Sequence, residues 1–456
     1  MKICNPATEA IIAEYQEDTA ETLSGKFSAL KAGQKAWALR TPGERLECIR
    51  KFGDLVRTNK NELAAVLTAE TGKPIQQSLN EINGAHNRIE HLSEYAVRVL
   101  ADEVMTDTGN THEKITYEPL GVIANISAWN FPYNVGYNVF LYALVAGNAV
   151  MYKPSEYAAM TGKQFEKYMH LSGVPRDVFQ CVIGDGKLGQ SMLELNFDGY
   201  FFTGSYKTGV HIAETVARKL VPLQLELGGK DPLYIADDVA DVKQAAIHAA
   251  EGAFYNNGQS CCAVERIYVA ESIYNEFVEA FVQEVGTYTM GDPASPDTFI
   301  GPVTREAQLE VLAKQVEDAV HKGATLRTGG ERVPGKGYYI EPAVLINCNH
   351  EMDIMKEESF GPVIGIQKVS SDEEAVRLMQ DTGYGLTAAV FCADEQRAKA
   401  ILDVMDTGTV YWNCCDRVSP YVPWSGRRNS GLGATLSVQG IRAFTRPKAY
   451  HWRKPS

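Results

Sequence analysis

Two adjacent cysteines follow a polar turn in the stretch FYNNGQSCCAVER, residues 254–266. The Asn-Asn-Gly at 256–258 is typical of a turn, and the apolar residues after Cys261 and Cys262 lead back toward a packed core. A sulfur at such a boundary can be reached by a substrate while backbone N–H groups stabilise its thiolate, as a nucleophilic cysteine requires. The alternative is that both thiols fill space as small hydrophobic side chains.

A single acidic residue, Glu226, lies between Leu225 and Leu227 and is followed by Gly-Gly. An apolar setting raises the pKa of a carboxyl toward neutrality, where it can accept a proton as a general base. A position on the surface is the commoner fate of a glutamate, but it explains poorly an acid between two leucines.

The whole chain has 456 residues, of which 45% are hydrophobic, so we expect two or three lobes. Its net charge of −13 argues against a nucleic acid or an anionic membrane as partner. The nine cysteines include no CxxC pair, and no His pairs stand at ligand spacing. We therefore expect reduced thiols, no metal site and a cytoplasmic location, with no secretory signal and no transmembrane helix.

Apolar residues at three- and four-residue spacing predict mostly helical structure from about residue 21 to residue 100. Four β-like stretches then alternate with helical ones, and each ends in a polar or glycine-containing loop. This pattern predicts an α/β fold with a doubly wound parallel sheet, followed by a second α/β lobe that runs to about Trp424. The four stretches are GVIANIS (121–127), AGNAVMYK (146–153), DVFQCVIG (177–184) and DGYFFTGS (198–205).

Five motifs in this order and spacing resemble the aldehyde dehydrogenase superfamily across nearly the whole chain. They are NPATEAII (5–12), WNFP (129–132), FTGS (202–205), LELGGKDP (225–232) and EESFGPV (357–363). The resemblance implies a dinucleotide-binding domain at 1–104 and 120–225, a catalytic domain at 226–424, and a small β arm for oligomerisation at 105–119 and 433–456. The tail ATLS (434–437) departs from the family's Arg-Glu pair and leaves local packing open.

The resemblance assigns catalytic roles to three residues. Cys261 matches the family's nucleophile, which attacks the aldehyde carbon and later carries the acyl group as a thioester. Asn130 matches the oxyanion donor, although an asparagine in a turn commonly caps its own backbone. Glu226 matches the general base, and family members that pass the acyl group to coenzyme A lack a glutamate there. We therefore expect a hydrolytic enzyme that releases a carboxylic acid.

The cofactor expected from the resemblance is NAD, with NADP possible. Glu156 can accept hydrogen bonds from both ribose hydroxyls, whereas Lys153 would suit a 2′-phosphate; the alternative is a solvated pair at a helix start. The GDGKLG at 184–189 matches a dinucleotide fingerprint in letters only. The cofactor residues carried over are Trp129, Lys153, Glu156, Gly186, Gly204, Ser205, Gly209, Leu227, Glu358 and Phe360.

The substrate is less defined, because two arginines that bind a carboxylate in succinate semialdehyde enzymes are replaced here by Tyr255 and Asn138. Arg417 or Arg427 could substitute for them. Aromatic residues instead suggest an aromatic-walled tunnel for a neutral or cationic aldehyde, with Asp416 near its mouth; the alternative is that the aromatic residues are core. The candidate substrate residues are Tyr133, Tyr137, Asn138, Tyr255, Cys262 and Asp416, with Trp412 beside them.

Two further expectations concern assembly and rival functions. The arm at 105–119, together with a final strand in the tail, predicts a homodimer or homotetramer. The rival functions are a succinate semialdehyde dehydrogenase and a thiol hydrolase without redox chemistry. The second is weakened because no histidine lies near the thiol in sequence.

Overall fold

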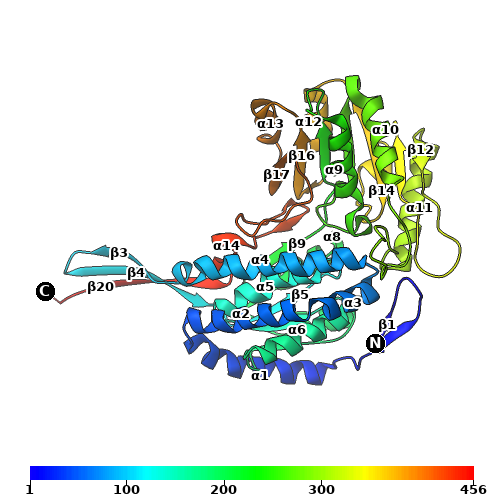
Figure 1. Cartoon of the computed structure of the whole chain (residues 1–456). Helices are drawn as coiled ribbons and strands as arrows, with labels where there is room; N and C mark the ends of the chain where they lie inside the picture. The colour runs from blue at the N-terminus through cyan, green and yellow to red at the C-terminus, as the bar shows by residue number, and fades with distance from the viewer. Residues whose placement is uncertain (456) are drawn as a thin grey trace.

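The computed structural model describes residues 1–455. Two α/β lobes face each other, and a three-stranded arm projects from the first lobe (Figure 1). Within the described residues, no helix is both long and apolar enough to cross a membrane. The predicted fold class, with its two parallel sheets and its β arm, is confirmed.

The first hundred residues form a short hairpin and four helices, as the apolar spacing predicted. The expected break at Pro42 is real, because Thr41 caps a new helix by accepting from the backbone N–H of Glu44. Gly72, at φ 79°, ends the third helix in a left-handed conformation. The elements are β1 (Lys2–Cys4), β2 (Ile11–Glu14), α1 (Ala20–Leu39), α2 (Pro42–Thr58), α3 (Lys60–Thr71) and α4 (Ile75–Val99).

The sheet of the first lobe has the strand order β19-β9-β8-β5-β6-β7, and all of it except β19 is parallel. The chain winds outward from β5 to β7 and then returns to the other side of β5. The strand order therefore reverses between β5 and β8, the place where such sheets bind ligands at the carboxyl ends of their strands. The elements are β5 (Val122–Ile126), α5 (Pro132–Val145), β6 (Ala149–Lys153), α6 (Ala159–Leu171), β7 (Phe179–Cys181), α7 (Gly186–Glu194), β8 (Gly199–Thr203), α8 (Tyr206–Val216), η1 (Ala217–Lys219), β9 (Leu223–Glu226) and β19 (Gly431–Leu432).

The second lobe is built on a seven-stranded sheet of order β12-β13-β14-β11-β10-β16-β17, in which only β12 is antiparallel. Its strands run from Pro232 to Trp412, inside the range predicted for the catalytic domain. The elements are β10 (Pro232–Ile235), α9 (Val242–Phe254), η2 (Tyr255–Gly258), β11 (Arg266–Ala270), η3 (Glu271–Ile273), α10 (Tyr274–Val285), α11 (Glu306–His321), β12 (Thr325–Thr328), β13 (Ala343–Ile346), η4 (Asp353–Met355), β14 (Val363–Val369), α12 (Asp372–Gln380), β15 (Tyr384–Gly385), β16 (Thr387–Phe391), α13 (Glu395–Leu402), β17 (Thr409–Trp412) and β18 (Arg427–Arg428).

The arm consists of β3 (Glu103–Asp107), β4 (Thr111–Pro119) and β20 (Thr445–Arg453). The strand expected in the tail is present: β20 pairs antiparallel with β4 along its full length. Between β19 and the arm, the short helix α14 (Ser437–Arg442) packs on α4, and the departing tail buries Leu436 completely. Figure 1 shows β3, β4 and β20 extending away from both lobes.

Candidate active site

The turn that carries the thiols has an unusual backbone, because Asn256 and Asn257 both adopt left-handed conformations at φ 53° and 57°. The Asn256 side chain donates to the carbonyl of Asn130 at 3.1 Å and to that of Gln259 at 3.0 Å. Gly258 is needed for a different reason: a Cβ there would lie 2.2 Å from the carbonyl oxygen of Gly361. The thiol loop is therefore held against both lobes.

The two cysteines have different surroundings. Both border a cavity, but Cys261 is partly exposed, whereas Cys262 is 4% exposed. The Cys262 thiol donates to Asp416 Oδ1 at 3.0 Å, and Ser260 Oγ donates to the same oxygen at 3.1 Å. The neighbouring Cys261 thiol, burial and the Asp416 carboxyl hold the pKa of Cys262 well above its ordinary value. Cys261 is thus the thiol that a substrate can reach.

Asn130 lies in the loop after β5 and is 4% exposed. Its Nδ2 donates to the carbonyl of Gln259 at 3.1 Å, which orients the amide beside the thiol loop. An amide nitrogen has two hydrogens, and this bond occupies one of them. Asn130 therefore retains one N–H next to the turn that presents Cys261.

Glu226 is the last residue of β9 and is 8% exposed. Gln224 donates to its Oε1 at 3.1 Å, while Oε2 has no partner within residues 1–455. Burial raises the pKa of Glu226 to about 8, in agreement with the direction expected from its apolar neighbours. Glu226 is thus a buried carboxyl with one unbonded oxygen and a pKa close to neutral pH, and both properties suit a general base.

The N-terminus of α8 meets the requirements of a pyrophosphate site. Ser205 is the exposed N-cap, and its side chain accepts from none of the free N–H groups of the first turn. Gly204 donates its N–H to the carbonyl of Glu226 at 3.0 Å, so α8 begins beside the end of β9. Gly209 allows close packing, because a Cβ there would lie 2.6 Å from the Leu227 side chain.

The two residues predicted for the adenosine ribose lie at the end of β6. Lys153 is 4% exposed and its Nζ donates to the carbonyl of Pro154 at 3.3 Å. Burial lowers the pKa of Lys153, with Glu156 and Asp185 opposing that effect. Glu156 is half-buried and accepts from Ser155 Oγ at 3.1 Å. Gly186 begins α7 close by, after its cap Asp185.

A further acidic residue, Glu358, reaches the loop that follows β9 from the second lobe. Glu358 Oε1 accepts from the backbone N–H of Gly229 at 3.3 Å, and burial raises the pKa of Glu358 to about 7. A Cβ on Gly228 would lie 2.1 Å from that oxygen, so a larger residue there would displace the Glu358 carboxyl. Phe360 packs edge-on against Trp129 with ring centroids 5.6 Å apart. Residues of both lobes thus converge on the expected cofactor region.

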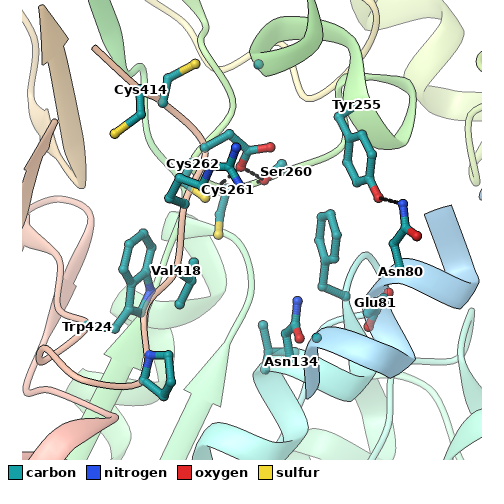
Figure 2. Close-up of a pocket in the computed structure, with 18 of the residues that line it drawn as sticks. Asn80, Glu81, Asn134, Tyr255, Ser260, Cys261, Cys262, Cys414, Val418 and Trp424 are labelled. Atoms are coloured by element: carbon teal, nitrogen blue, oxygen red, sulfur yellow. Dashed lines mark hydrogen bonds between the residues drawn. The ribbon is translucent and has the colours of Figure 1, made fainter. Parts of the chain in front are cut away.

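A cavity of about 510 Å³ opens beside Cys261. In Figure 2, Asn80, Glu81 and Asn134 lie on one side, Val418 and Trp424 lie on the other, and Cys261 lies between them. Tyr255 also lines this cavity, and its hydroxyl accepts a hydrogen bond from Asn80 Nδ2 at 3.3 Å. The remaining lining residues are Gly84, Asn87, Arg88, Phe131, Val135, Asn138, His248, Glu251, Gly252, Ser260, Cys262, Asn413, Cys414, Cys415, Asp416, Arg417 and Pro420.

The sequence predicted an aromatic-walled tunnel, but of the four aromatic residues expected in its wall only Tyr255 lines the cavity. Tyr133 and Tyr137 are 0% and 1% exposed and pack in the core around Phe165, because α5 turns these side chains away from the cavity. Trp412 does not line the cavity either, and its indole N–H donates to the carbonyl of Cys392. Apolar rings gain more by joining the core than by bordering a polar cavity.

Of the charged residues expected at the cavity, Asp416 and Arg417 border it, whereas Arg427 does not. Asp416 is not a free carboxylate at the mouth, since Ser260 and Cys262 both donate to it and burial raises its pKa. Arg427 does not line the cavity and instead forms an ion pair of 3.3 Å with Asp406. Arg417, in contrast, borders the cavity. Asp416 is therefore not a free carboxylate that could bind a cationic substrate.

Arg88, a buried residue of α4 that lines the cavity together with several asparagines, was not expected from the sequence. Its position within a helical repeat gave one signal, because a charged residue on the buried face of an amphipathic helix needs an explanation. The helical spacing alone could not show that this face borders a cavity.

Comparison with known proteins places the chain in context. The model of the aldehyde dehydrogenase family matches residues 1–450. An aldehyde dehydrogenase of Davidiella tassiana is 32% identical, over 98% of this chain and 90% of its own length. The NAD⁺ complex of betaine aldehyde dehydrogenase from Staphylococcus aureus superposes with a TM-score of 0.96 at 30% identity, over 100% of this chain and 92% of that one. An NADP-dependent enzyme of E. coli has a TM-score of 0.96 at 27% identity, over 99% and 94%.

Proposed function

The chain belongs to the aldehyde dehydrogenase family and is an NAD(P)-dependent oxidoreductase, and we propose that it converts an aldehyde to the free carboxylic acid through an acyl group on Cys261. The observation that carries this proposal is the setting of three side chains. The accessible thiol of Cys261 borders a cavity. The buried Asn130 amide lies in the loop that follows β5, and the buried Glu226 carboxyl ends β9, so both belong to the carboxyl edge of the first sheet, with β8 between their strands.

The first step is attack of the Cys261 thiolate on the aldehyde carbon, which places a negative charge on the aldehyde oxygen. The free N–H of Asn130 and the backbone N–H of Cys261 are the donors for that oxygen. Because Asn130 is already oriented by the carbonyl of Gln259, little reorganisation accompanies the charge that develops. Cys262 takes no part in this step, since its thiol is hydrogen-bonded to Asp416.

The nicotinamide cofactor, when bound, accepts the hydride that converts the adduct to a thioester. The residues that fit it are the first turn of α8 for the pyrophosphate, Glu156 and Lys153 for the adenosine ribose, and Glu358 for the nicotinamide ribose. Glu226 then removes a proton from water so that the thioester is hydrolysed. The released group is a carboxylic acid, and the thiol is regenerated.

Replacing Asn130 by alanine is expected to lower kcat by about 100- to 1000-fold, because one preorganised donor to the developing oxyanion is lost. Steady-state NADH formation measures the effect. Asn134→Ala, which removes an amide from the cavity wall without touching the thiol loop, is the matched control and should stay within about tenfold of the wild type. An Asn130→Ala enzyme with normal kcat would show that the oxyanion is held elsewhere.

NAD is the preferred cofactor in this proposal. Glu156 repels a 2′-phosphate, while the ammonium of Lys153 is buried and already bonded to a backbone carbonyl. The experiment that tests the proposed function measures NADH and NADPH production with a panel of aldehydes and identifies the product. A free acid with higher kcat/KM for NAD supports it, whereas an acyl-coenzyme A product or the absence of any aldehyde-dependent reduction contradicts it.

We also propose that the arm joins copies of this chain into a homodimer or homotetramer. Its outer strands β3 and β20 leave backbone edges unpaired within residues 1–455. Val104, Met105 and Trp452 of these strands are 60%, 61% and 56% exposed, an arrangement that favours burial against a second copy. Sedimentation at the mass of a single 50.2 kDa chain would contradict this assembly.

A further inference from the structure

Arg88 is a buried cation without a counter-ion. It projects from α4, is 4% exposed and borders the cavity beside Cys261. Its Nε donates to Asn138 Oδ1 at 2.9 Å, and within residues 1–455 this is its sole hydrogen bond and no carboxylate lies within ion-pair distance. Burial lowers the pKa of Arg88 to about 10, so the side chain remains protonated at neutral pH.

The other deeply buried arginines show how this chain normally accommodates such a group. Arg266 is 0% exposed and donates to the backbone carbonyls of Lys230 and Met379 at 2.8 and 2.7 Å, among others. Arg45 is 5% exposed and donates to the carbonyl of Val145 at 2.8 Å and to two further carbonyls. Both arginines therefore hold backbone segments together through several hydrogen bonds to carbonyl groups. Arg88 instead leaves its terminal nitrogens unbonded at the border of a cavity.

The nearby acidic groups do not compensate Arg88. Glu81 forms an ion pair with the buried Lys73 and accepts from the backbone N–H of Tyr133. Asp416 accepts from Ser260 and Cys262, and its burial favours the neutral form. Glu251 is exposed to solvent on α9, where water screens its charge. Arg88 is thus a buried positive charge of the wall that has no partner, whereas Arg417, which also borders the cavity, is exposed to solvent.

We propose that Arg88 and Asn138 form an anion subsite on the α4–α5 wall of the cavity and that the substrate is an aldehyde whose far end carries a carboxylate. The guanidinium offers a planar pair of donors that matches a carboxylate, and Asn138 Nδ2, unbonded within residues 1–455, adds a third. A carboxylate would balance the buried charge, which a neutral or cationic end group leaves unpaired. This inference rests on the proposed function and narrows its substrate class.

The test compares matched aldehydes with the wild-type enzyme and NAD. Succinate semialdehyde and glutarate semialdehyde are each paired with their primary amides, which have the same shape without the charge, and 3-aminopropanal is the cationic member. The carboxylates should have kcat/KM values about 30- to 100-fold above those of the amides, the effect expected for hydrogen bonds to a charged group. Equal or higher values for the amides or the amine would overturn the subsite. Oxidation of none of these aldehydes, nor of aliphatic ones, would instead refute the proposed function.

Arg88→Met should reduce the carboxylate-to-amide ratio to about one, mainly by lowering the activity on the carboxylates. Arg98→Gln removes an exposed positive charge from the same helix away from the cavity and should leave the ratio unchanged. A ratio that survives in Arg88→Met would refute the subsite. If that variant does not fold, product inhibition of the wild-type enzyme tests the subsite. The inhibition constant of succinate against the aldehyde should be at least about tenfold lower than that of butanoate. Equal inhibition constants would refute the subsite.

Discussion

Replacing Cys261 by alanine is expected to lower aldehyde oxidation by about 10⁴-fold or more, because no other described group can form the covalent adduct at this position. Cys262 cannot substitute for it. Its thiol is buried, donates to Asp416 at 3.0 Å, and has a pKa held well above the ordinary value. Steady-state NADH formation and mass spectrometry of the protein with bound acyl group measure the loss.

The matched control is Cys262→Ala, which should keep activity within about tenfold of the wild type, since it removes a neutral thiol outside the reaction path. Retained NAD binding by Cys261→Ala, followed by cofactor fluorescence, would show that the fold is intact. An inactive Cys262→Ala enzyme beside an active Cys261→Ala enzyme would reverse the assignment of the nucleophile.

Replacing Glu226 by glutamine is expected to separate hydride transfer from hydrolysis. The first turnover should yield about one NADH per active site, after which steady-state turnover falls by about 10²- to 10⁴-fold, the usual contribution of a general base. The neighbouring Gln224 is the matched control: Gln224→Ala removes the hydrogen bond to Oε1 but keeps the carboxyl. It should therefore retain steady turnover, and stopped-flow absorbance at the NADH band follows both phases.

The pH dependence follows from the direction of the Glu226 shift. Only the carboxylate can accept a proton from water, and with a pKa of about 8 it is ionised in about one molecule in ten at pH 7. The steady-state rate should therefore rise with pH and level off above about pH 9. Glu226→Gln should lack this inflection. Loss of the initial burst in Glu226→Gln would place the residue before hydride transfer and contradict its role in hydrolysis.

Cys261→Ala and Glu226→Gln affect different steps of one mechanism. Together they distinguish an aldehyde dehydrogenase from a thiol hydrolase. A hydrolase would lose its activity on a thioester or ester in both variants and would form no NADH in either. The burst expected from Glu226→Gln requires the redox step to precede the hydrolytic one. It therefore tests the order of events as well as the residues.

Local patterns in the sequence were sufficient for the parallel sheets. Strands such as β5 and β8 are short apolar runs bounded by polar loops, and their side chains are buried on both faces. The order of the motifs indicated the catalytic residues, since Cys261, Glu226 and Asn130 each lie in a short motif whose residues are neighbours in the chain. The raised pKa of Glu226 could likewise be anticipated from its two leucine neighbours.

The substrate cavity depended on contacts that no local pattern contains. Its walls come from α4 and α5 on one side and from the segment around Asp416 and Trp424 on the other, which are far apart in the sequence. Helical periodicity could not tell which face of α5 meets the cavity, so Tyr133 and Tyr137 were expected there and lie in the core instead. An aromatic residue is compatible with either place until the opposite wall is known.

By itself, the sequence determined the reaction class, the nucleophile candidate and the two lobes, because each depends on residue types within a few positions of one another. The tertiary structure alone decided which thiol is accessible, that Asp416 is occupied, and that Arg88 has no counter-ion. Each of these is a statement about what surrounds a group in three dimensions. Burial and hydrogen-bond partners set the charge state of a side chain, and they are assembled only when distant segments pack together.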